Sequence, residues 1–129
     1  AGRNDAQALT SPVVQELGSE MQGAVRIVDG SMNKILQRGE FAIFSPADDL
    51  GELEAHTGKI AYVERKRGDL VERSLRIIAK RKDGMRLECY STDSRFAESI
   101  AYPSKRPSET VRIVGFVVGK YAEMQPLII

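Results

Sequence analysis

The chain has few of the residues that make covalent cross-links or metal sites. Its 129 residues include one cysteine, Cys89, and one histidine. A lone thiol cannot form an internal disulfide, and structural zinc needs four ligands, usually cysteine and histidine. We therefore expect no metal, no cofactor and a buried, unpaired Cys89. Apolar burial should stabilise one domain, which a chain of this length can provide.

The sequence also lacks an excess of charge of either sign. Lysine and arginine number 19, aspartate and glutamate number 18, and the formal net charge is +1. A domain that binds nucleic acid directly usually carries a basic face. We therefore expect any DNA contact to be made by another part of the protein. Local clusters of basic residues at 64–67 and 80–82 adjoin glycine turns, and we interpret them as solvated hairpin tips.

Long apolar runs are absent as well. No stretch reaches the roughly 20 residues of a membrane-spanning helix. The first residues lack the basic and apolar regions of a signal peptide. The sequence therefore predicts a soluble, cytoplasmic protein without membrane contacts.

Alternating apolar and polar segments, separated by turn signals, make up most of the chain. Asp83-Gly84 lies between two such segments, which is typical of a β-hairpin. We interpret the polar stretch 1–23 as a linker or N-terminal arm. Residues 24–129 are predicted to form an all-β domain of several curled antiparallel sheets with almost no helix. The predicted strands are 24–28, 40–44, 59–63, 72–81, 85–90 and 111–119.

The order of these segments resembles the LexA, UmuD and phage-repressor family of self-cleaving C-terminal domains. In that family a strand runs into a Ser-Met pair and a glycine-acidic pair opens the next strand, as Ser31-Met32 and Gly39-Glu40 do here. The resemblance covers residues 24–121 and implies the LexA/signal-peptidase-like fold. The further matching segments are a glycine-started strand at 58–63, a long hairpin at 72–90, a polar stretch at 92–96 and a last core strand at 112–119.

The resemblance implies a serine–lysine dyad with Ser31 at the nucleophile position. A serine hydroxyl is a poor nucleophile until a neighbouring base takes its proton. A lysine can act as that base if burial lowers its pKa towards neutrality. Ser31 follows Gly30 at a predicted strand end, where its hydroxyl can project and nearby N–H groups can hold an oxyanion.

The base position departs from the family pattern. Arg76, just before Ile77-Ile78, stands where the family has its lysine, and an arginine is effectively never neutral in a protein. Residues at 74, 76, 78 and 80 share one face of a strand. If the alignment with the family is shifted by four residues along this strand, Lys80 stands at the base position and the dyad is restored. Both alternatives remain open, and the sequence favours Arg76 and an inactive site.

Asp29 is a second departure from the pattern. Relatives have Gly-Xaa-Ser-Met, whereas this chain has Asp29-Gly30-Ser31-Met32. A carboxylate close to Ser31 is expected to hold Arg76 by a charge-assisted hydrogen bond. An ion pair would then occupy the place of an active site.

The first two residues, Ala1-Gly2, match the bond that the family cleaves. Family members cut an Ala-Gly or Cys-Gly bond in the segment ahead of the domain. Ala1-Gly2 is therefore either that cleavage site or an arbitrary terminus, and the sequence leaves the two interpretations open.

Taken together, these features predict the dimerisation or oligomerisation domain of a phage-type (prophage) or LexA-like transcriptional repressor. Operator DNA would be bound by an N-terminal helix-turn-helix domain outside this sequence. The apolar segments 111–118 and 127–129 are the candidate interface. One alternative is an active autoprotease of the SOS response, using Ser31 and Lys80 and triggered by a RecA filament. The other is a UmuD-like polymerase accessory subunit.

Overall fold

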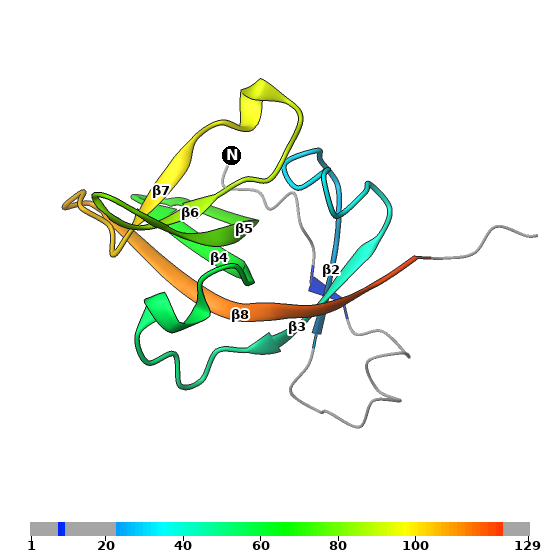
Figure 1. Cartoon of the computed structure of the whole chain (residues 1–129), viewed down its shortest axis with the longest axis horizontal. Coiled ribbons are helices and arrows are strands. Elements are labelled where there is room, and N and C mark those ends of the chain that lie inside the picture. The colour runs from blue at the N-terminus through cyan, green and yellow to red at the C-terminus, as the bar shows by residue number, and fades with distance from the viewer. Residues whose placement is uncertain (1–7, 10–22, 123–129) are drawn as a thin grey trace, which may run out of the picture.

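A computed structural model of the chain describes residues 8–9 and 23–122 (Figure 1). Seven strands of four to thirteen residues form one antiparallel sheet, and the two-residue β1 extends it at one edge. The strand order is β1-β2-β3-β8-β4-β5-β6-β7. The element bounds are β1 Ala8–Leu9, β2 Gly23–Arg26, β3 Phe41–Pro46, β4 Ile60–Arg67, β5 Leu70–Arg81, β6 Gly84–Glu88, β7 Ser99–Tyr102 and β8 Glu109–Tyr121, with the short 3-10 helices η1 Leu53–His56 and η2 Ser94–Phe96.

The predicted all-β, antiparallel domain is confirmed, but its strands form one sheet rather than several. The reason is the length of β8, which has thirteen residues. Its first part pairs with β4, up to Ala61 opposite Phe116. Its second part pairs with β3, as far as Phe41 opposite Tyr121. One strand thus connects the β2–β3 half of the domain to the half that contains β4 to β7.

Two hydrophobic clusters pack on opposite faces of this sheet. On β4, Tyr62 belongs to the first cluster, whereas Ala61 and Val63 belong to the second. This division follows from the alternation of side chains along a strand. Because both faces are covered, residues 61–65 of β4 are all buried. The first cluster also contains Met32 and Leu36 from the turn after β2.

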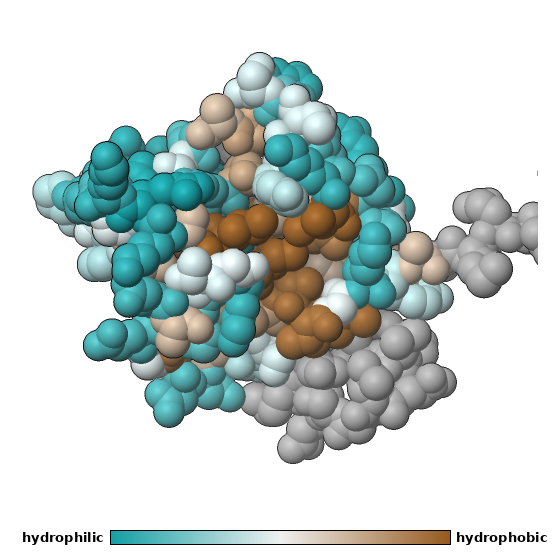
Figure 2. Space-filling view, in the orientation of Figure 1, coloured by the Kyte–Doolittle hydropathy of each residue, from teal (hydrophilic) through white to brown (hydrophobic). Residues whose placement is uncertain are grey.

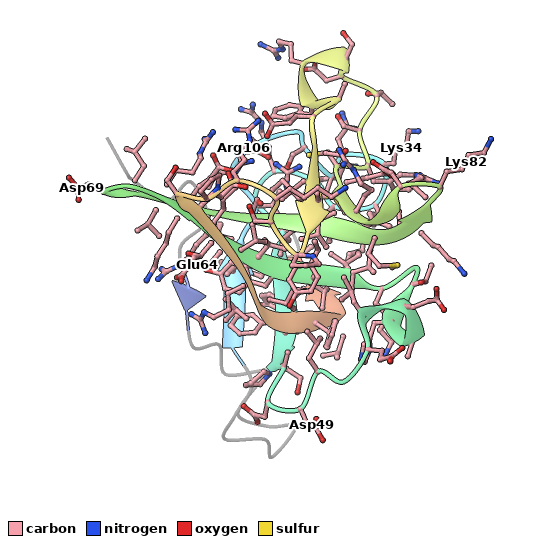
Figure 3. All side chains as sticks on the ribbon, turned by 90° about the vertical axis from the view of Figure 1, so that its left-hand side faces the viewer. Lys34, Asp49, Glu64, Asp69, Lys82 and Arg106 are labelled. Atoms are coloured by element: carbon pink, nitrogen blue, oxygen red, sulfur yellow. The ribbon has the colours of Figure 1, made fainter. Side chains whose placement is uncertain are left out.

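Several boundaries differ from the sequence-based expectations. The β5–β6 hairpin forms as predicted, and Gly84 next to its tip has a φ of 120°, which glycine adopts without strain. Figure 3 shows Asp69 and Lys82 at the tips of the β4–β5 and β5–β6 hairpins. By contrast, β7 was not predicted, and η1 lies between two predicted strands, where the sequence predicted no element. The predicted buried strand at 111–119 is buried only in part, since Ile113 is 6% exposed but Val118 is 58% exposed.

The ends of the chain are described only in part. Within the predicted arm 1–23, Ala8 and Leu9 pair with β2. The candidate cleavage site Ala1-Gly2 and the apolar segment 127–129 lie outside the described residues. In the part that the structure describes, no helix is long and apolar enough to cross a membrane.

Candidate functional site

Ser31 lies in a tight turn that leads from β2 to β3. Hydrogen bonds fix this turn from within, because the Leu36 N–H donates to the Met32 carbonyl at 2.8 Å and both side chains are buried. A further hydrogen bond connects the turn to another segment, because the Tyr90 N–H donates to the Ser31 carbonyl at 3.0 Å. The turn therefore holds Ser31 against the chain segment that follows β6.

The hydroxyl of Ser31 is engaged by a carboxylate. It donates a hydrogen bond to Asp29 Oδ1 at 2.7 Å, and the Ser31 backbone N–H donates to the same oxygen at 2.9 Å. Asp29 thus holds Ser31 and not Arg76, contrary to the expected ion pair. A carboxylate orients a hydroxyl in this way but is a much weaker base than a neutral amine.

Arg76 is buried, and its guanidinium connects several backbone segments. Its Nη1 donates to the Glu98 carbonyl at 2.9 Å and to the Leu87 carbonyl at 3.4 Å. Its Nε donates to Ser74 Oγ at 3.2 Å. Its closest carboxylate oxygen among the described residues is Glu98 Oε1, 4.0 Å from Nη2. Arg76 therefore ties β5 to β6 and to the segment before β7.

Ser31 and Arg76 line the same cavity, whose volume is about 320 Å³. Asp29, Ser74 and Cys89 also line it, so the structure brings together the two residues that the sequence placed at the nucleophile and base positions. The remaining lining residues are Arg65, Arg67, Glu72, Arg73, Arg95, Phe96 and Glu98.

Lys80, the alternative base, lies elsewhere. Its Nζ is 2.9 Å from Glu54 Oε1 on η1, and its side chain is 63% exposed. Among the described residues it is not part of the lining of the Ser31 cavity. An exposed, ion-paired lysine is also in the wrong environment for a base, since desolvation is what lowers a lysine pKa.

Charged side chains on β4 contribute to the cavity in a way that the sequence did not indicate. The 64–67 cluster was expected to be solvated, yet Glu64 and Arg65 are buried. The expectation was wrong for these two residues because β4 is a central strand covered on both faces, whereas the side chains of Lys66 and Arg67 are 56% and 41% exposed. Arg65 Nη2 donates to Glu72 Oε1 at 2.9 Å and to Glu98 Oε1 at 3.0 Å. No local sequence signal distinguishes this buried arginine from its neighbours.

The shifted pKa values of Glu98 and Cys89 reflect the charge and burial of the cavity. Burial acts to raise the pKa of Glu98, but the hydrogen bond from Arg65 and the charges of Arg65, Arg76 and Arg67 outweigh it and lower the pKa. Burial raises the pKa of the Cys89 thiol, against the opposing charge of Arg76. The cavity thus favours anions, while Cys89 remains a neutral thiol and a poor nucleophile.

The described residues contain no group of three or more histidine, cysteine, aspartate or glutamate side chains placed to hold a metal ion. Comparison of the chain with protein-family models, with curated proteins and with solved structures gave no match. The functional proposal is therefore based on the geometry of the Ser31 cavity, on the pairing of β8 and on the order of the sequence segments.

Proposed function

We propose that residues 24–129 are the C-terminal dimerisation domain of a phage-type or LexA-like transcriptional repressor, with a degenerate self-cleavage site and a variant of the LexA/signal-peptidase-like fold. The main support is the cavity that Ser31 and Arg76 both line. Lysine is absent from the described lining of this cavity. The protein would act in the cytoplasm.

The chemistry of the cavity explains why cleavage would not occur. Peptide bond cleavage by Ser31 requires that a base take the hydroxyl proton as the oxygen attacks. An arginine side chain is not a proton acceptor, and Nη1 of Arg76 is directed to two backbone carbonyls. Asp29 holds the hydroxyl without being a strong enough base to activate it. Among the described residues, the only partner of the hydroxyl proton is therefore the weakly basic carboxylate of Asp29.

The edge of β8 supports the dimerisation role. Beyond Phe116, β8 no longer pairs with β4, and residues 117–121 pair only with β3 in the described part of the chain. In Figure 1 this end of the strand extends past β4. An unpaired strand edge is a template for pairing with a second chain. A two-fold axis would bring two such edges together antiparallel.

An apolar surface adds to this support. Figure 2 shows apolar residues gathered at the centre of one face, near β8, with hydrophilic residues to the left and right of them. Contiguous apolar patches with a polar rim are typical of interaction sites. A dimer would tether two DNA-binding domains, so that both operator half-sites are bound at a high effective concentration.

Incubation of the full-length protein at alkaline pH, with and without a RecA filament, tests the proposal. We expect the wild type and Ser31→Ala to stay intact and to bind operator DNA equally well. Arg76→Lys is the positive control, because it places an amine in the cavity and should introduce slow cleavage that requires Ser31. Serine-dependent cleavage of the wild type would instead show an active autoprotease. Absence of any operator binding would favour the polymerase accessory subunit.

A further inference from the structure

The described lining of the Ser31 cavity contains five arginines and three carboxylates. Two of these arginines pair with carboxylates outside the lining, Arg73 with Glu64 and Arg95 with Asp93. Two others are deeply buried, because the side chains of Arg65 and Arg76 are 8% and 7% exposed. Burying a guanidinium is costly unless an anion or strong acceptors compensate it. Arg65 and Arg76, together with Arg67 in the same lining, therefore make the cavity a favourable place for an anion.

Several guanidinium donors in the cavity have no acceptor among the described residues. Arg65 Nε is buried without a hydrogen-bond partner. Arg76 Nη2 is 4.0 Å from its nearest carboxylate oxygen, which is too far for a hydrogen bond. The closest carboxylate oxygens to Arg67 lie at 3.7 and 3.9 Å, from Glu72 and Glu109. The guanidinium groups of these three arginines can therefore donate further hydrogen bonds to oxygen atoms.

Glu98 shows where an oxyanion fits in this cavity. Its Oε1 lies 3.0 Å from Arg65 Nη2 and 4.0 Å from Arg76 Nη2, between the two buried guanidiniums. Its own side chain is nevertheless 62% exposed. A solvent-exposed carboxylate can be displaced by another anion, because water solvates it when it leaves. The position it occupies is therefore accessible to an external anion.

We propose that the cavity binds a small polyanion with two or more phosphate or carboxylate groups. One group replaces the Glu98 carboxylate between Arg65 and Arg76, and a second group binds Arg67. The planar arginine fork matches both carboxylate and phosphate oxygens. A volume of about 320 Å³ accommodates a ligand of this size. Binding requires neither cleavage nor dimerisation, so it extends beyond the function proposed above.

Isothermal titration calorimetry of the 129-residue chain tests the proposal. The probes are pyrophosphate, citrate and inorganic phosphate at constant ionic strength in chloride buffer. We expect one molecule of pyrophosphate or citrate to bind per chain, and inorganic phosphate to bind more weakly because it offers one group. Pyrophosphate alone would identify a phosphate ligand, and citrate alone a carboxylate ligand. Absence of binding by both would overturn the proposal.

Two variants with opposite expected effects locate the site. Arg67→Gln removes a ligand contact and should weaken binding about tenfold, which is the effect of one charge-assisted hydrogen bond. Glu98→Gln removes the competing charge and should strengthen binding several-fold. Arg112→Gln is the matched control, because Arg112 also pairs with a glutamate but lies outside the cavity lining. Equal weakening by Arg67→Gln and Arg112→Gln, or no gain with Glu98→Gln, would contradict the assignment.

Discussion

At the scale of single residues, the identity of one side chain determines what the Ser31 cavity can do. The sequence predicted Ser31 and Arg76 as partners, and both line one cavity. It did not predict that Asp29 would hold the serine hydroxyl. Asp29 is only two residues from Ser31, so the turn itself brings the Ser31 donors to the Asp29 carboxylate. Arg76 instead donates to backbone carbonyls on β6 and before β7. Which hydrogen-bond partner each side chain takes depends on backbone positions that cannot be read from the sequence.

Glu64, labelled in Figure 3, offers a test of buried charge on the other face of β4. Burial acts to raise the pKa of this carboxyl, but the hydrogen bonds and charges of Arg73 and Arg112 lower it below its ordinary value. A lowered folded-state pKa means that the carboxylate stabilises the fold above its unfolded pKa of about 4.3. This contribution is lost as the pH falls through the folded-state pKa.

We therefore expect Glu64→Gln to lower the free energy of unfolding at pH 7 by about 1.5–3 kcal/mol, the range for hydrogen bonds to charged groups. The difference between variant and wild type should shrink below about pH 4. Urea denaturation at a series of pH values between 7 and 3 measures both quantities. An equal loss at pH 7 and pH 3 would contradict the ion-pair explanation.

At the scale of elements, the sequence predicted most strands but not their partners. Alternation and glycine turns located β2 to β6 and β8 within a few residues, because both are local properties. Pairing is set by contacts between distant residues, so the continuous sheet through β8 was not foreseen. The edge strand β7 was missed because Ser99–Tyr102 is only four residues long and shows little periodicity.

The pairing of β3 with β8 provides a test at this scale. A Cβ atom on Gly115 would lie 2.4 Å from the Ser45 carbonyl oxygen, which belongs to the backbone and cannot move aside cheaply. We expect Gly115→Ala to destabilise the fold by about 1–3 kcal/mol through overpacking. Gly119→Ala is the control, because nothing lies within 4 Å of its added Cβ. Urea denaturation of the two variants should separate them clearly, and equal stabilities would refute the close approach.

At the scale of the whole molecule, the proposed dimer depends on the edge of β8 that no other described strand pairs with. Val118 is 58% exposed on that edge. We expect Val118→Arg to raise the dimer dissociation constant at least about tenfold, because a charge would be buried against its own copy. Leu70→Arg is the control, since Leu70 is 50% exposed at the tip of the β4–β5 hairpin. Analytical ultracentrifugation measures both, and an unchanged dimer with Val118→Arg would place the interface elsewhere.

The position of β8 in the chain also affects biosynthesis. β3 and β4 follow each other in sequence, yet each pairs with β8 and not with the other. While the ribosome is translating, the two halves of the sheet have no shared neighbour until residues 109–121 emerge from the exit tunnel. Folding of this domain should therefore be completed only after nearly all of it has been synthesised, and the incomplete chain exposes unpaired strand edges to chaperones and to other nascent chains.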